Sequence, residues 1–393
     1  MGVRRQLERV KKVDLQAIIS DMYKHGLRRW LLLALTDAYE EARQGKKRTA
    51  DEHAFEVNEY QNLINLRDAI LERRYKNGDS IVFVIFDPMV REIFAAPFRA
   101  RVVHHFLNWM TAGWWDQHFI PDSFSCRVGK GTDSGRARAQ KMMRRVSQGG
   151  RRKAWSLKMD ISGYFMSLPR EKLYERILWG LEQQFKDVMD DPMGRQLFSI
   201  CAYLWHEVIM DDPTVNARRR GAIWHWDPKV LPMNKSLYTQ PDGYGLPIGN
   251  VTSQLASNIY LDLFDRYVVY ELGYKNYVRY VDDFVIFVPD EEKVRLLADV
   301  EKMEKFLLEE MELTLHKKKR SCQEVRKGVN FVGGRIYLNC IMPSNRLQAK
   351  FPEALKALIV GEGSLDTVVS YVGLMRHMDA NNYILSVLNR LGE

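Results

Sequence analysis

The sequence has few of the features that mark secreted, membrane-spanning or repetitive proteins. Its 393 residues include only four cysteines, and these form no CxxC pair, which argues against a disulfide framework and a zinc knuckle. The most apolar early run, Trp30 to Leu35, falls far short of the roughly 18 residues that span a bilayer. Internal repeats and low-complexity tracts are also absent. We therefore expect a cytoplasmic protein without a signal peptide, whose thiols are reduced.

Positive charge is in excess. The chain has 59 Lys and Arg against 50 Asp and Glu, which gives a formal net charge of +9, and 46% of its residues are hydrophobic. The hydrophobic share supports a folded core divided into several domains. The charge favours a polyanionic partner such as nucleic acid. A membrane surface fits the charge as well, but the short apolar run argues against it.

The spacing of apolar residues predicts the order of the elements. Between residues 15 and 71 it predicts a helix, a basic loop at 45–48 and a second helix. Strands are predicted at 81–86, 156–159, 276–280, 284–288 and, as a pair, 329–338, and helices at 169–183, 250–272, 291–311 and 347–390. Residues 190–245 read as less regular, and their basic triplet at 218–220 fits either phosphate tracking or a solvated loop. This order predicts an α+β fold with an antiparallel sheet.

Two adjacent acids, Asp282 and Asp283, stand between two strand-like runs, where a hairpin turn is expected. Charged turns are common, but the apolar neighbours of these acids would leave their carboxylates partly dry, and such carboxylates repel each other unless a cation neutralises them. Asp160 ends another predicted strand. If the strands are neighbours, these acids can hold two magnesium ions, which prefer oxygen ligands, and catalyse nucleotidyl transfer.

The segment Tyr280-Val281-Asp282-Asp283 resembles the YxDD box of group II intron-like reverse transcriptases. Other boxes follow in the family's order: an acid box at Asp160 to Phe165, a template and nucleotide box at 245–254, a lysine box at 313–319, a primer grip at 328–333, and fingers segments at 91–93, 98–105 and 125–131. The resemblance implies a right-hand polymerase. Its parts are expected at 1–75 (N-terminal helical extension), 76–150 (fingers), 151–342 (palm, with an insert at 184–244) and 343–393 (helical thumb).

The resemblance also implies roles for single residues. Two Mg²⁺ ions are expected on Asp160, the Ile161 carbonyl, Asp282 and Asp283, and the three aspartates are expected to be catalytic. Nucleotide contacts are expected from Arg91, Arg101, Lys130, Phe165, Ile248, Gly249, Gln254 and Lys319. Template or primer contacts are expected from Arg127, Asn250, Ser253, Phe331 and Gly333.

Structural alternatives remain for several of these residues. Phe165 is expected under the nucleotide sugar, with its neighbour Tyr164 as the alternative. Ile248 stands where retroviral enzymes carry a glutamine, which predicts low fidelity unless the side chain only packs. Thr252 or Ser253 could instead cap the following helix.

Within the family, the sequence at residues 235–237, 245–250 and 252–254 resembles that of the enzymes of diversity-generating retroelements of bacteria and phages. Such enzymes copy a template-repeat RNA into cDNA with errors opposite adenine, alongside a small, basic, oligomeric accessory variability protein. The resemblance implies template RNA, an RNA–DNA hybrid and deoxynucleoside triphosphates as ligands, in a bacterial cytoplasm and away from membranes. The alternatives are a retron-like or antiphage-defence reverse transcriptase, an RNA-directed RNA polymerase, and a catalytically silent RNA-binding scaffold.

Overall fold

A computed structural model describes residues 12–44, 49–86 and 89–392 of the protein, so the predicted loop at 45–48 lies outside the described residues. The chain forms two compact units, each assembled from separate stretches of sequence. Unit 1 consists of Met1–Phe119, Gly163–Phe264 and Glu309–Leu313, and unit 2 of Ile120–Ser162, Asp265–Leu308 and Thr314–Glu393. The predicted four-part division of the chain stays a prediction.

Unit 1 begins with helices, and here the prediction of two helices is wrong. The segment forms α2 (Leu15–His25), α3 (Leu27–Ala42), α4 (Ala50–Val57) and α5 (Glu59–Leu71). Gly26 separates α2 from α3, since its φ of +83° cannot continue a helix and its amide closes α2 by donating to the Met22 carbonyl. A break at this position is invisible to apolar periodicity, because both helices bury apolar residues on either side of the glycine.

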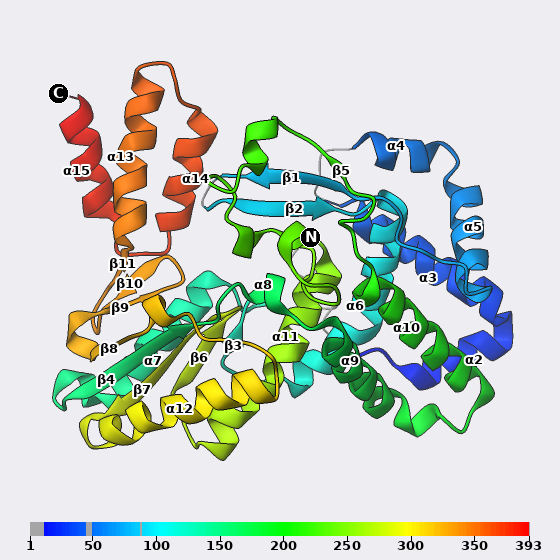
Figure 1. Ribbon diagram of the computed structural model, residues 1–393, viewed down its shortest axis with the longest axis horizontal. Coiled ribbons are helices and arrows are strands. Elements are labelled where there is room, and N and C mark those ends of the chain that lie inside the picture. The colour runs from blue at the N-terminus through cyan, green and yellow to red at the C-terminus, as the bar shows by residue number, and fades with distance from the viewer. Residues whose placement is uncertain (1–11, 45–48, 87–88, 393) are drawn as a thin grey trace. The chain divides into compact units, whose positions relative to one another are not determined.

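The rest of unit 1 holds a small sheet and several helices. The sheet order is β2-β1-β5, with β1 (Ile81–Ile85) antiparallel to β2 (Arg91–Ala95) and parallel to β5 (Arg218–Arg219) (Figure 1). The α-helices are α6 (Phe98–His118), α8 (Tyr164–Ser167), α9 (Arg170–Phe185), α10 (Pro192–Met210) and α11 (Val251–Arg266), and the last two residues of α11 belong to unit 2. Short 3₁₀ helices are η2 (Lys186–Val188), η3 (Ile223–Trp226), η4 (Met233–Lys235) and η5 (Leu237–Thr239).

Helix α10 corrects the expectation of an irregular region after residue 190. The Asp191 side chain accepts hydrogen bonds from the amides of Met193 and Gly194, and Pro192 fills the first helical position. These are standard helix start signals. Apolar residues at three- and four-residue intervals then bury one face of the helix. The irregular prediction holds only for the segment after Met210.

Unit 2 is built on a five-stranded sheet of order β3-β6-β7-β4-β8 (Figure 1). The strands are β3 (Ser123–Phe124), β4 (Ala154–Asp160), β6 (Tyr277–Tyr280), β7 (Asp283–Pro289) and β8 (Ser321–Glu324). All neighbouring strands are antiparallel except β3 and β6. Helix α7 (Thr132–Val146) packs its Met142 and Met143 into a buried cluster with Val285 and Phe287 of β7. The predicted α+β fold with an antiparallel sheet is confirmed.

The remaining elements of unit 2 lie at its C-terminal end and between the strands. A second sheet has the order β11-β10-β9, from β9 (Val329–Phe331), β10 (Gly334–Ile336) and β11 (Ile341–Pro343). Its helices are η1 (Gln148–Gly150), the π-helix η6 (Tyr267–Glu271), η7 (Asp290–Glu292), α12 (Lys293–Glu309), η8 (Lys317–Lys319), η9 (Val325–Lys327), α13 (Asn345–Ile359), α14 (Leu365–Met375) and α15 (Asn381–Gly392). The last three pack around Phe351, Tyr371 and Met375. Among the described helices, none has the length and apolar character needed to cross a membrane.

Candidate active site

The three predicted acids occupy neighbouring strand ends in unit 2. Strands β6 and β7 form the expected hairpin, and β4 lies beside β7, so Asp160 is the direct register partner of Asp283. The Ile161 amide donates to the Asp282 carbonyl at 3.2 Å. Opposed residues of an antiparallel pair have Cα atoms only about 4.5–5.5 Å apart. The three aspartates therefore share one end of one sheet.

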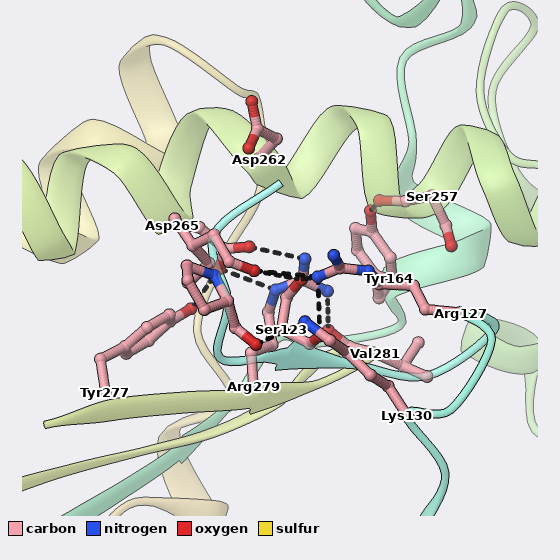
Figure 2. A network of polar contacts seen from close by, with 12 residues as sticks. Ser123, Arg127, Lys130, Tyr164, Ser257, Asp262, Asp265, Tyr277, Arg279 and Val281 are labelled. Carbon is pink, nitrogen blue, oxygen red and sulfur yellow. Dashed lines mark hydrogen bonds and ion pairs between the residues drawn. The ribbon is translucent and has the colours of Figure 1, made fainter. Parts of the chain in front are cut away.

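The hairpin turn that carries Asp282 has an unusual backbone. Val281 adopts a φ of +55°, a left-handed conformation that β-branched residues rarely take. The Arg279 guanidinium donates to the Val281 carbonyl at 2.9 Å. The same guanidinium forms two 2.7 Å hydrogen bonds with the Asp265 carboxylate, which also accepts the Tyr277 hydroxyl at 2.6 Å (Figure 2). This buried network holds the turn in its conformation.

Sequence reasoning missed the network, although one signal for it was present. Arg279 sits in the middle of a short apolar strand, and a fully buried cation needs a partner. The partner, Asp265, lies 14 residues earlier at the end of α11. Nothing in the sequence links that acid to the strand, because the pairing exists only once the chain has folded.

Two lysines of unit 2 neutralise the acids. The Lys319 ammonium lies 2.8 and 3.0 Å from the two carboxylate oxygens of Asp160, and the Lys158 ammonium lies 3.0 Å from Asp283 Oδ2. The pKa of Asp283 is raised to about 7, mainly by burial; Lys158 lowers this pKa, and Asp160 and Asp282 make smaller contributions that raise it. The Asp283 carboxyl is therefore poised between its charged and neutral forms near neutral pH.

The donor set suits a hard divalent cation. Over the described ranges, no three His, Cys, Asp or Glu side chains are already arranged around a common metal position; two of the carboxylates face ammonium groups instead. However, Asp283 Oδ1 is buried and has no hydrogen-bond partner among the described residues. A buried carboxylate oxygen without a partner is costly, and oxygen ligands of this kind are those that magnesium prefers. The residues present thus fit the predicted metal.

A cavity of about 410 Å³ in unit 1 gathers four of the predicted nucleotide and template residues: Arg101, Gly249, Asn250 and Gln254. The end of β2 and the first turns of α6 form its other wall. Arg101 Nε donates to the Ala96 carbonyl at 2.9 Å, which fixes the guanidinium at the rim. Sequence reasoning placed these residues in separate boxes, and the fold of unit 1 brings them together.

Gly249 has to be glycine at the cavity wall. Its φ is +131°, and an added Cβ would lie 2.7 Å from the Phe94 carbonyl oxygen. The neighbouring Ile248 carbonyl accepts the Phe94 amide at 2.9 Å. The Ile248 side chain packs against the buried cluster that contains Val82 and Phe94. The structure thus supports a packing role for Ile248.

The other predicted residues of unit 1 are more scattered. Arg91 is exposed at the start of β2, and Phe165 is half-buried in α8. The alternative to Phe165, Tyr164, is buried and donates its hydroxyl to the Ser257 carbonyl at 2.6 Å, so it is a core residue.

Ser253 is buried within α11, which begins at Val251. Because both Thr252 and Ser253 lie inside this helix, neither is its N-cap residue, and that alternative is wrong.

The other predicted residues of unit 2 have structural partners. Arg127 donates to the carbonyls of Ile120 and Ser123, at 2.9 and 3.0 Å. Lys130 donates to the Pro121 carbonyl at 2.6 Å. Phe331 is buried in the core beneath the sheet, and Gly333 turns β9 into β10 with a φ of +72°. Template and primer contacts by these residues stay predictions.

Comparison with protein families places the arrangement in a class. The profile described as reverse transcriptase (RNA-dependent DNA polymerase) matches residues 99–336, more than half of the chain. An α+β fold with three aspartates at one end of its antiparallel sheet, matched by this profile, has the architecture of a right-hand polymerase. The chain belongs to the reverse transcriptase family.

Solved structures of telomerases resemble the chain at low identity. Apo telomerase from Candida tropicalis has 11% identity and a TM-score of 0.47, over 80% of this chain and 59% of that chain. Telomerase from Candida albicans, in complex with a TWJ fragment of telomeric RNA, has 12% identity and a TM-score of 0.45, over 81% of this chain and 56% of that chain. This chain thus spans less than two thirds of those telomerase chains. The comparison with curated proteins gives no match.

Proposed function

We propose that this chain is an RNA-directed DNA polymerase. One observation carries the proposal: the β4–β7 register and the β6–β7 hairpin bring Asp160, Asp282 and Asp283 to one end of one sheet. Two magnesium ions bound there would supply activation of a primer 3′-hydroxyl and stabilisation of the leaving pyrophosphate. Asp160, Asp282 and the Ile161 carbonyl are their proposed ligands, and Asp283 is a near or outer ligand.

The lysines and the cavity residues have complementary proposed roles. Lys319 and Lys158 balance the negative charge of the acids, so that the carboxylates stay at the sheet end rather than repelling one another. Lys319 is also the proposed cation for the pyrophosphate. In unit 1, the Arg101 guanidinium is suited to a triphosphate oxygen. Gln254 offers an exposed amide to a base or sugar in the same cavity.

At finer detail, we propose a diversity-generating retroelement enzyme that copies a template-repeat RNA into cDNA with errors opposite adenine. The support is the residues at 235–237, 245–250 and 252–254, which resemble the enzymes of those retroelements. Template RNA, an RNA–DNA hybrid, deoxynucleoside triphosphates and a basic oligomeric accessory variability protein are the proposed partners, in a bacterial cytoplasm.

Primer extension with Asp282→Asn tests this proposal. With an RNA template, deoxynucleotides and magnesium, we expect the wild type to make cDNA and Asp282→Asn to lose at least about a hundredfold in rate, because a metal ligand loses its charge. The matched control is Asp290→Asn, a surface acid of unit 2 that accepts a hydrogen bond from Trp155. This control is expected to keep wild-type activity.

Sequencing of the cDNA separates the finer alternatives. Errors concentrated opposite adenine support the retroelement enzyme, whereas accurate cDNA points to a retron-like or antiphage-defence reverse transcriptase. Incorporation of ribonucleotides in place of deoxynucleotides would identify an RNA polymerase. Full activity in Asp282→Asn, or no synthesis by the wild type even with the template RNA and accessory protein added, would contradict the polymerase proposal and favour a silent scaffold.

A further inference from the structure

The small sheet of unit 1 presents two arginines on an open face. The amides of Arg218 and Arg220 donate to the carbonyls of Ser80 and Val82, both at 2.8 Å, which docks this segment along β1. Alternate residues of a strand point to the same side. The side chains of Arg218 and Arg220 therefore share one face of the sheet, and both residues are exposed.

The middle arginine has a different environment. Arg219 is the register partner of Val82, which belongs to the buried cluster on the other face. Its guanidinium lies over the rings of Trp226 and Tyr238, at 4.9 and 4.3 Å from their centroids. Arg219 is exposed like its two neighbours, but these rings hold its guanidinium and so anchor the segment.

Two aromatic residues that follow the arginines pack against the residue that follows β1, and the three form an aromatic platform. We use this name for Phe86, Trp224 and His225. The Trp224 ring lies over Phe86 with centroids 5.5 Å apart and planes 31° apart, and the edge of His225 meets Phe86 at 4.9 Å. Trp224 is nevertheless 59% exposed. Exposing one face of an indole ring to water, while the other face packs on a ring, is energetically unfavourable.

We propose that the aromatic platform and the Arg218–Arg220 pair bind single-stranded nucleic acid, namely an unpaired stretch of the copied RNA. An unpaired base would stack on Trp224, and the two guanidiniums would hold consecutive phosphates, which is how non-sequence-specific single-strand sites are built. Within a duplex, neighbouring base pairs cover both faces of each base, so an interior base has no free face for the indole. An apolar protein partner does not explain two exposed arginines that stand a few residues before Trp224 in the same segment. The identification of the bound nucleic acid as the copied RNA rests on the proposed function.

Binding of a labelled RNA tests the inference without catalysis. The probe is an unstructured RNA of about 15 nucleotides, titrated with full-length protein in the absence of deoxynucleotides and followed by fluorescence anisotropy. We expect Trp224→Ala to raise Kd about tenfold, and Trp224→Phe, which keeps a stacking ring, to stay within about threefold of wild type. The matched control is Trp179→Ala, an indole of α9 that is 41% exposed and lies under Arg176. This control is expected to bind as the wild type does.

The salt dependence tests the arginines separately. Each phosphate contact with a single strand contributes about 0.7 to the slope of log Kd against log salt. The double variant Arg218→Gln/Arg220→Gln should therefore lower this slope by about 1.4. A double variant that removes the same charge from the N-terminal helices, Lys24→Gln/Arg29→Gln, should leave the slope unchanged.

Several outcomes would overturn the inference. The first is a wild-type Kd in Trp224→Ala, and the second is a rise in Kd in Trp224→Phe or Trp179→Ala as large as that in Trp224→Ala. The third is an unchanged salt slope in the Arg218→Gln/Arg220→Gln variant. The fourth is a loss of affinity for a blunt RNA duplex as large as the loss for the single strand. Single-stranded DNA of the same sequence reports whether the 2′-hydroxyl matters, and preferential loss of DNA binding in the variants would contradict an RNA ligand. The proposed function fails on a different result, the absence of primer extension by the wild type.

Discussion

At the scale of single residues, Asp283 shows how the fold sets the chemistry of a carboxyl group. The sequence places it beside Asp282, but its pKa is raised to about 7 mainly by burial, and Lys158 works against that shift. A carboxyl group with such a pKa populates both its charged and its neutral form near neutral pH. The chemistry of the pair in Tyr280-Val281-Asp282-Asp283 therefore differs from that of two solvated turn acids.

Gly249→Ala should destabilise the protein. The new Cβ would lie 2.7 Å from the Phe94 carbonyl oxygen at a φ of +131°, and a residue forced into such a conformation costs about 1–3 kcal/mol before the clash is added. Urea unfolding measures the loss. The control, Gly373→Ala near the end of α14, has nothing within 4 Å of its new Cβ and is expected to be neutral or stabilising by up to about 1 kcal/mol. Equal effects of the two changes would contradict the prediction.

Buried His104 should make stability fall in mild acid. Burial lowers the pKa of His104 from about 6.5 to about 3, so between these values the unfolded chain binds a proton that the folded chain does not. Stability should fall as pH drops below about 6.5, by at most about 1.4 kcal/mol per pH unit from this group. Unfolding at pH 7 and pH 5 measures the difference. We expect His104→Leu to reduce it and His53→Leu, on an exposed residue, to leave it unchanged; identical pH dependence in all three proteins would contradict the assignment.

At the scale of elements, the β6–β7 hairpin depends on a helix residue that is distant in sequence. Asp265 and Arg279 are both fully buried and form a bidentate ion pair. Such a pair is weak as a source of net stability, because desolvation opposes the attraction. Removal of only one of the two partners, however, leaves an unpaired charge in the core.

Asp265→Ala should therefore cost about 3–5 kcal/mol of folding free energy, and it should lower polymerase activity through the Val281 turn. The double variant Asp265→Leu/Arg279→Met, which removes both charges, should recover most of the stability. Arg28→Ala, which breaks an exposed pair with Asp68, should cost less than about 1 kcal/mol. Chemical denaturation of the variants measures these free energies. A small loss of stability in Asp265→Ala, together with a larger loss in the double variant, would contradict an unpaired buried charge.

Elements also show where sequence patterns work. Strands β4, β6 and β7 lie close to their predicted positions, because short apolar runs that are bounded by polar or turn-forming residues are typical of strands. Helix α10 was missed although Asp191-Pro192 marks its start. The surrounding basic and aromatic residues obscured its regular apolar face, and local composition outweighed periodicity in the prediction.

At the scale of the whole molecule, the net charge of +9 predicts how nucleic acid binding responds to salt. A site that contacts about six phosphates of an RNA–DNA hybrid should lose roughly a thousandfold in affinity between about 50 and 200 mM salt. Anisotropy titrations with a labelled hybrid at several salt concentrations measure this slope. A flat response would show that backbone contacts do not dominate hybrid binding.

The α+β class, the antiparallel sheet and the three aspartates could all be predicted from the amino-acid sequence. Strand periodicity and the acids at strand ends are local properties, written within a few residues of each other. Folding sets the Asp160–Asp283 register, the lysines that face these two acids and the buried Asp265–Arg279 pair. It also gathers Arg101, Gly249 and Gln254 around one cavity. These features join residues that are far apart in the chain, and their energies depend on burial, which exists only after the elements pack together.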